Sequence, residues 1–191
     1  NTTGSSPNGD LPFITRYDLR NGKTDTIWRC AEGTYEFVSK VLDPENLTFI
    51  TRRESTTEMP NYRIKNLKKR IADIPLTSFT NPYPQLEGVH KEKIVYQRAD
   101  GVTLTGELYL PKGYDKEKDG PLPMLIWAYP REYNSASDAA QIRGSEHRFT
   151  LLSWGSPIFY VTQGYAVLNN AEMPIVATDA SKKPNDNFIE Q

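Results

Sequence analysis

The first 80 residues repeat one short pattern, and this pattern constrains the fold more than any other feature of the sequence. Six runs rich in β-branched and aromatic residues follow one another, at residues 13–19, 24–28, 35–42, 47–52, 62–67 and 70–76. The dipeptide Asn21-Gly22 separates the first two runs, and Asp43-Pro44-Glu45-Asn46 separates the next two. Because Asn-Gly between two such runs is the strongest short-range hairpin signal, the sequence predicts three successive β-hairpins.

The second and third hairpins together have the dimensions of a known repeat unit. Residues 35–76 correspond to about the four-strand, ~40-residue size of a β-propeller blade. A β-sandwich uses meandering hairpins at similar spacing. The hairpins alone leave both folds open.

After the proline-rich link at residues 81–84 the pattern changes. Residues 90–97 and 102–110 alternate around Asp100-Gly101 and predict one long hairpin. Two buried strands are expected at residues 122–129 and 165–168, with a short helix at residues 158–163 between them, capped by Ser156-Pro157 and ended by Gly164. An antiparallel hairpin followed by strand, helix and strand begins an α/β sheet with an antiparallel edge, and we expect this sheet to be incomplete.

Composition excludes several classes of partner. The 23 basic and 24 acidic residues nearly cancel, which argues against nucleic acid or a membrane surface as a partner. No apolar run approaches the ~18 residues of a membrane span. Cys/His zinc spacing, a P-loop and a dinucleotide fingerprint are all absent from the sequence, so no metal and no cofactor is predicted.

Five motifs occur in an order that is characteristic of one enzyme family. They are RRESTTEMPNY (52–62), LTSFTNPYPQL (76–86), YQRADGVTLTGELYLPKGYD (96–115), PLPMLIWAYPREY (121–133) and QGYAVLNN (163–170). On these motifs the chain resembles the prolyl oligopeptidase family of serine peptidases. It is most similar to the branch that includes glutamyl endopeptidases and bacterial exported dipeptidyl-peptidase-like proteins.

The resemblance implies a mixed β and α/β architecture with three parts. Residues 1–80 would be the terminal blade region of a β-propeller, and residues 81–89 a linker. Residues 90–191 would be the first strands of an α/β-hydrolase sheet, truncated before the nucleophile elbow. The chain would then be an internal fragment of a peptidase.

The resemblance also singles out one candidate site residue. In the family, the strand that corresponds to residues 124–128 ends at a loop beside the active site, and in several members a tyrosine there donates to the oxyanion hole. Tyr129 occupies the matching position, and Pro130, Arg131 and Glu132 stand where many members have glycines. A tyrosine at the end of a strand also commonly serves only for packing and local hydrogen bonding.

The rest of the catalytic machinery is not expected in this chain. An α/β-hydrolase serine stands in Gly-x-Ser-x-Gly and is followed by an acid and a histidine, whereas no two glycines here are four residues apart. His90 and His147 precede the expected elbow, so we expect solvated or locally bonded side chains. The fragment alone is therefore predicted to be inactive. The alternative hypothesis is a non-catalytic, β-rich binding module.

The predicted partners and location follow from the same resemblance. The parent enzyme would act on peptides, with a preference for glutamate left undecided, and in the periplasm or outside the cell. The remainder of the same polypeptide would complete the fold. Since a single blade and a partial sheet leave strand edges open, we also expect copies of the fragment to associate.

Overall fold

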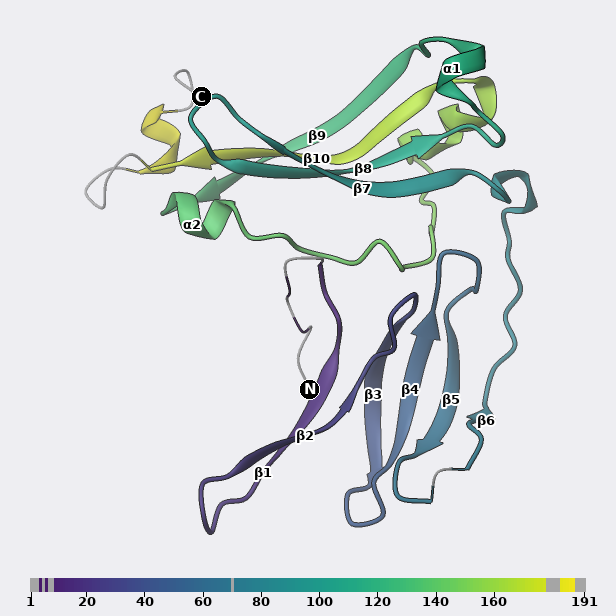
Figure 1. The fold of residues 1–191 in the computed structure, drawn as a ribbon, viewed down its shortest axis with the longest axis vertical. Helices are drawn as coiled ribbons and strands as arrows, with labels where there is room; N and C mark the ends of the chain where they lie inside the picture. Colours follow the sequence, from purple (N-terminus) through teal and green to yellow (C-terminus); the bar gives the residue numbers. More distant parts are fainter. Residues whose placement is uncertain (1–3, 5, 7–8, 70, 178–182, 188–191) are drawn as a thin grey trace. The chain divides into compact units, whose positions relative to one another are not determined.

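The computed structural model describes residues 4, 6, 9–69, 71–177 and 183–187. Their regular secondary structure is mostly β-strand, and they divide into two units (Figure 1). One unit comprises residues 1–82 and 143–151, and the other residues 83–142 and 152–191. No sequence pattern had indicated that residues 143–151 group with the first unit. Among the described residues, no helix has the length and hydrophobicity needed to cross a bilayer.

The first unit consists of a two-stranded ribbon and a four-stranded antiparallel sheet. Its strands are β1 (Phe13–Tyr17), β2 (Thr24–Arg29), β3 (Tyr35–Asp43), β4 (Thr48–Glu54), β5 (Asn61–Asn66) and β6 (Ile74–Pro75). Each strand of the sheet pairs with the next one along the chain, so three hairpins are present. The last strand, expected over residues 70–76, covers only Ile74–Pro75. Gly22 has a φ of 70°, the left-handed backbone that a tight hairpin turn requires. Arg70, where the last strand was expected to begin, lies outside the described residues.

The core of this unit lies between the ribbon and the sheet. Ile14, Val38 and Phe49 are buried together, and Ile27 and Trp28 of β2 pack against them. A buried polar cluster lies close by: the Thr51 hydroxyl donates to Glu36 at 2.6 Å. Because side chains alternate along a strand, β3 and β4 direct these residues to one face.

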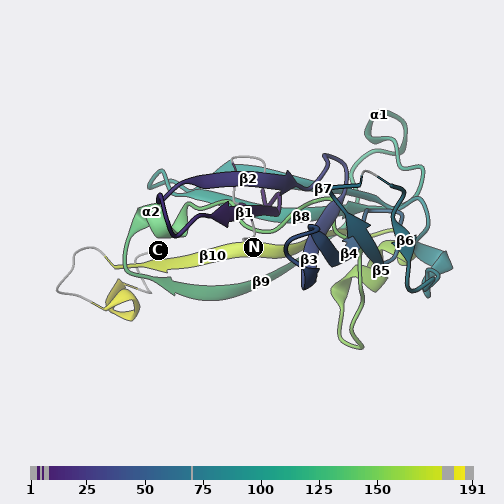
Figure 2. The same ribbon diagram turned by 90° about the horizontal axis from the view of Figure 1, so that it is seen from below.

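The second unit contains a mixed sheet in the order β7-β8-β10-β9. Its strands are β7 (His90–Gln97), β8 (Thr103–Leu110), β9 (Met124–Tyr133) and β10 (Ala166–Val176). Its short helices are η1 (Pro84–Leu86), α1 (Lys116–Asp119), α2 (Ala136–Ala139), η2 (Pro157–Gln163) and η3 (Pro184–Asn187). β7, β8 and β10 are antiparallel neighbours, while β9 and β10 run parallel. Figure 2 shows β9 beside β10 along the edge of this sheet.

The expected helix between the two parallel strands is present as a 3-10 helix. The Ser156 hydroxyl accepts a hydrogen bond from the Ile158 N–H at the start of η2, Pro157 fills the first turn, and Gly164 ends it with a φ of 85°. Ile158 and Val161 of η2 are buried with Tyr109 and Val167 of the sheet. The sequence signals for the start and stop of this helix were therefore correct.

Both faces of the sheet carry a core cluster. Tyr109 lies in the cluster under η2, whereas Leu104 packs with Ala139 of α2 and with Val176. Leu104 and Tyr109 are an odd number of positions apart in β8, so their side chains point to opposite faces.

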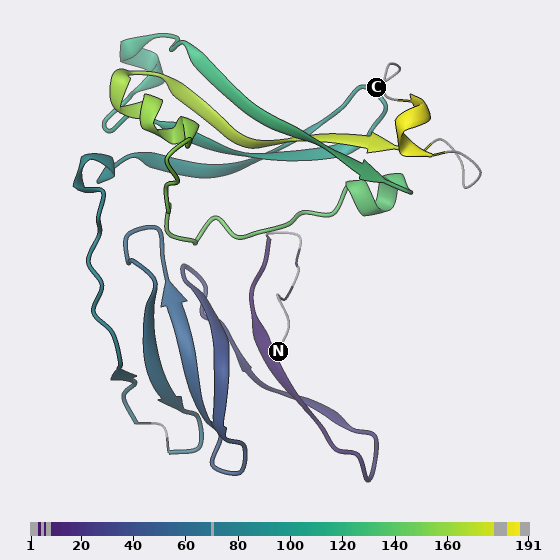
Figure 3. The same cartoon turned by 180° about the vertical axis from the view of Figure 1, so that it is seen from behind.

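Three predictions about the parallel strands were wrong. The strand expected to end at Tyr129 continues to Tyr133, and the strand expected to end at Leu168 continues to Val176. They are longer because β9 and β10 stay paired beyond an irregularity between Leu168 and Ala171. β9 was also expected to be buried, but it is the edge strand beside β10 (Figure 3). Most of its residues are exposed.

Candidate functional site

Tyr129 lies within the edge strand β9 rather than after its end. The residue is 76% exposed to solvent. The strand continues through Pro130 and Arg131. Proline is tolerated here because an edge strand has one side that needs no backbone N–H donor.

The neighbour of Tyr129 across the parallel pair is Glu172 of β10. The Glu172 carboxylate accepts a hydrogen bond of 2.7 Å from the backbone N–H of Thr105 in β8. Tyr96 is also near this carboxylate: the pKa of the Tyr96 phenol is raised, chiefly by burial and in addition by the negative charge of Glu172. Glu172 therefore connects the strand beside Tyr129 to the centre of the sheet. No sequence motif had indicated this residue.

A second hydrogen bond links β10 to the hairpin of β7 and β8. The Arg98 guanidinium donates to the carbonyl oxygen of Pro174 at 2.6 Å. The same side chain binds both carboxylate oxygens of Asp100 in the hairpin turn, at 2.9 and 2.7 Å. Pro174 is the register partner of Arg131, two residues beyond Tyr129.

The two histidines belong to different units. The Nε2 atom of His90 is 3.5 Å from a carboxylate oxygen of Glu92. The Nε2 atom of His147 is 4.0 Å from Glu146 and belongs to the other unit. Each histidine therefore has a local acidic neighbour.

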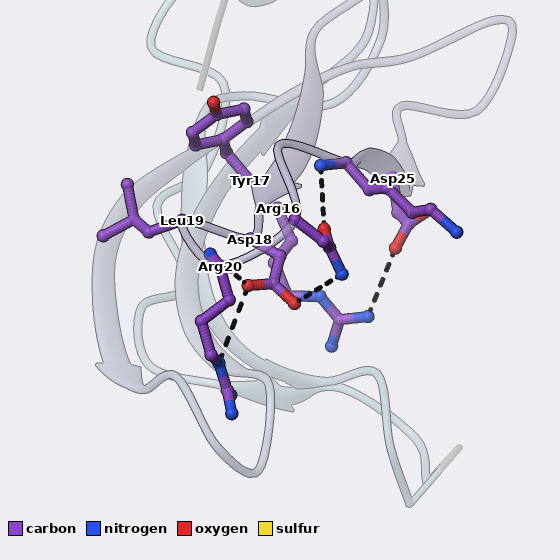
Figure 4. Close-up of a pocket in the computed structure, with 8 residues that line it drawn as sticks. Arg16, Tyr17, Asp18, Leu19, Arg20 and Asp25 are labelled. Carbon is purple, nitrogen blue, oxygen red and sulfur yellow. Dashed lines mark hydrogen bonds and ion pairs between the residues drawn. The ribbon is translucent and has the colours of Figure 1, made fainter.

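A hollow at the tip of the first hairpin is lined by charged residues that bind one another (Figure 4). Asp18 accepts hydrogen bonds from the Arg20 backbone N–H at 2.8 Å and from the Asn21 side chain at 3.1 Å. Arg16 lies 3.4 Å from Asp25 across the hairpin. These contacts stabilise the turn, and we assign no ligand to this hollow.

Comparison with known proteins finds close relatives of one kind. No protein-family model matches the chain. A protein of Oryza sativa subsp. japonica described as a probable chloroplastic glutamyl endopeptidase is 38% identical over 200 residues, an alignment that covers 100% of this chain. The corresponding protein of Arabidopsis thaliana is 37% identical over the same share of the chain.

Over its whole length the chain is therefore homologous to these two probable glutamyl endopeptidases. This confirms the resemblance to the prolyl oligopeptidase family that its motifs indicated. The chain spans about a fifth, 21%, of the length of these curated relatives.

Solved structures agree on the fold. A candidate dipeptidyl aminopeptidase IV from Bacteroides ovatus superposes with a TM-score of 0.54 and 16% identity, over 85% of this chain and 21% of the other. Oligopeptidase B from Leishmania major superposes with a TM-score of 0.51 and 11% identity, over 86% and 22%. The architecture thus resembles that of peptidases that combine a propeller with an α/β-hydrolase domain.

Proposed function

We propose that the chain is a segment of a serine peptidase of the prolyl oligopeptidase type, and that Tyr129 donates a hydrogen bond to the oxyanion of the reaction. The observation that carries the proposal is homology over the whole chain to glutamyl endopeptidases. In this proposal the strands between residues 13 and 76 belong to the terminal propeller blade region, which gates access of substrate. The sheet of β7 to β10 is the start of the catalytic domain.

The proposed chemistry assigns Tyr129 one defined task. The serine Oγ, supplied by another part of the polypeptide, bonds to the scissile carbonyl carbon and passes its proton to the triad histidine. The carbonyl oxygen then carries the negative charge, and the Tyr129 hydroxyl donates to it. One such donor contributes roughly 3–4 kcal/mol to stabilising the transition state.

The reaction is completed by groups outside this chain. The C–N bond breaks as the amine takes the proton back from the histidine, which leaves an acyl-enzyme. Water then hydrolyses the ester and regenerates the serine. Isolated from the triad, the 191 residues are expected to hydrolyse nothing.

Substrate and location are part of the same proposal. The substrates would be peptides, and the name of the relatives supports testing peptides with glutamate before the scissile bond. We infer an exported location, periplasmic or extracellular. The relatives are described as chloroplastic, which is also outside the cytosol.

The test uses the full-length polypeptide that contains this segment. Tyr129→Phe removes only the hydroxyl, so we expect kcat on the best peptide of a panel to fall about a hundredfold with little change in KM. Tyr17→Phe is the matched control, because Tyr17 is another tyrosine on a strand, 59% exposed, in the other unit. It should leave both constants unchanged.

Two results would count against the proposal in different ways. An unchanged kcat in Tyr129→Phe would leave the peptidase assignment intact and return Tyr129 to a packing role. A full-length protein that binds peptides but cleaves none would instead favour the non-catalytic binding module.

A further inference from the structure

β10, which pairs with the strand of Tyr129, has β8 as a second neighbour along only part of its length. Val167, Leu168 and Asn169 of β10 pair with β8, and among the described residues the pairing of these strands ends there. Asn170 has a φ of 51°, and the register with β9 shifts between Leu168 and Ala171. From Ala171 to Val176, β9 is the one strand among the described residues with which the backbone of β10 pairs.

Gly106 of β8 lies against β10 at the point where the two strands stop pairing. A Cβ atom on Gly106 of β8 would lie 2.8 Å from Leu168 and 3.6 Å from the Cα atom of Ala171. The absence of a side chain at Gly106 therefore leaves room for the Leu168 side chain. β10 does not pair with β8 at Thr105. The backbone N–H of Thr105 therefore has no backbone acceptor in β10.

Glu172 supplies that acceptor. Thr105 is only 6% exposed, and a buried backbone N–H without a partner costs about 1–3 kcal/mol. The Glu172 carboxylate reaches across and accepts this hydrogen bond at 2.7 Å. A side chain therefore does here what a backbone carbonyl does in the rest of the sheet.

The residue that makes this link is the register partner of Tyr129. Glu172 and Tyr129 are paired across β10 and β9, and β9 has no other strand beside it among the described residues. The distance between β10 and β8 therefore determines where β9 holds Tyr129. A misplacement of about 1 Å in a catalytic group can cost about a hundredfold in rate.

We propose that Glu172 is a positioning residue for Tyr129, acting through its hydrogen bond to Thr105 N–H and the parallel pairing of β9 with β10. This inference rests on the proposed function of Tyr129. It requires a side chain of the length of glutamate that ends in an acceptor oxygen, and it does not require a negative charge. Arg98, bound to Pro174, fixes the same strand two residues further on.

The experiment compares two mild substitutions in the full-length enzyme. Glu172→Gln keeps the length and an acceptor oxygen but removes the charge. Glu172→Asp keeps the charge but withdraws the acceptor by one methylene. We expect Glu172→Asp to lower kcat about tenfold with less than about a twofold change in KM, and Glu172→Gln to retain most of the activity. Glu117→Gln, an exposed glutamate of α1 whose side chain is 81% accessible, is the control.

Each substitution is also made together with Tyr129→Phe. If Glu172 acts through the Tyr129 hydroxyl, Glu172→Asp has less than about a twofold effect on kcat once that hydroxyl is absent, because coupled residues are not additive. Equal effects with and without the hydroxyl would overturn the inference. So would the reverse order, with Glu172→Gln more damaging than Glu172→Asp.

These variants distinguish a failure of this inference from a failure of the proposed function on which it rests. If Tyr129→Phe lowers kcat but Glu172→Asp leaves kcat unchanged, only the positioning role of Glu172 is overturned. Tyr129→Phe with unchanged kcat overturns the oxyanion role, and the positioning role with it.

Discussion

At the scale of single residues, Arg98 makes three side-chain hydrogen bonds that link parts of the second unit. It binds both oxygens of Asp100 and the carbonyl of Pro174, and its side chain is only 18% exposed. The hydrogen bond from Arg98 is the main reason why the pKa of Asp100 is lowered from 3.8 to about 2. A planar guanidinium facing a carboxylate in this bidentate manner is fixed in orientation as well as in charge. The hairpin turn is thus tied to β10 by a charged group.

This pair predicts a dependence of local stability on pH. A carboxyl whose pKa is lower in the folded than in the unfolded chain stabilises the fold above the unfolded pKa, and this stabilisation is lost as pH falls through the folded pKa. For Asp100 the loss therefore occurs between about pH 4 and about pH 2. Asp100→Asn should speed amide hydrogen exchange in residues 98–104 about fivefold at pH 7, as expected for loss of roughly 1 kcal/mol.

Hydrogen exchange followed by mass spectrometry checks this expectation. The ratio of exchange rates, variant over unaltered protein at the same pH, should shrink toward one as pH is lowered to about 2. Glu117→Gln serves as control and should give a ratio of one throughout. A ratio for Asp100→Asn that does not change with pH would contradict the assigned ion pair.

At the scale of elements, β4 holds a segment that is distant in the sequence. Glu54, the last residue of β4, is 1% exposed, and its Oε2 atom accepts a hydrogen bond from the Phe149 backbone N–H at 2.9 Å. Its Oε1 atom binds Arg52 at 2.9 Å and lies 3.8 Å from Arg148, whose guanidinium stacks on Tyr35. One buried carboxylate thus connects residues 143–151 to the sheet of the first unit.

Removing this carboxylate should release the segment. Glu54→Ala leaves the Phe149 N–H without its acceptor and Arg52 without its partner, and breaking a buried pair costs about 3–5 kcal/mol. We expect trypsin to cut after Arg143 and Arg148 at least about tenfold faster in this variant, because cleavage follows the population of the open segment. Limited proteolysis read by mass spectrometry measures it.

Two further variants make the result specific. Glu54→Gln retains an acceptor oxygen and should be cut at an intermediate rate. Glu58→Gln changes a glutamate whose side chain is 54% exposed and that pairs with Arg53, and it should be cut like the unaltered protein. The same cleavage rate in all variants would mean that Glu54 does not hold the segment.

Local signals in the sequence predicted elements well and long-range contacts poorly. The hairpins and the 3-10 helix follow from turn residues and caps, which act within a few positions of the chain. The ends of β9 and β10 could not be predicted, because they depend on pairing between two strands about 40 residues apart. The links from Glu54 to Phe149 and from Glu172 to Thr105 join residues 95 and 67 positions apart, and a single glutamate in a strand gives no sign of such a partner. Tyr129 was found only through the family resemblance.

At the scale of the whole molecule, β9 forms an edge of the second sheet and has β10 as its one neighbouring strand among the described residues. β9 is ten residues long and carries Met124, Ile126 and Trp127 with 52%, 61% and 54% of their surfaces exposed. Natural edge strands are normally short, charged or covered, because their free backbone groups can pair with another chain. Among the described residues, nothing gives this part of β9 such protection, whereas the far end of the strand contains Pro130 and Arg131.

The isolated 191-residue chain is therefore expected to associate through β9 at micromolar concentration. A lysine on the edge should oppose this, since bringing two copies together would bury its charge, so Ile126→Lys is predicted to shift the chain toward monomer in sedimentation velocity. Leu19→Lys is the matched control, because Leu19 is 89% exposed but lies in the turn of the first hairpin and belongs to no strand of this sheet. It should leave the association unchanged. If the unaltered chain sediments as a single monomeric species at the same concentration, the exposed residues of β9 do not form a contact between copies, and their exposure has to be explained within one polypeptide.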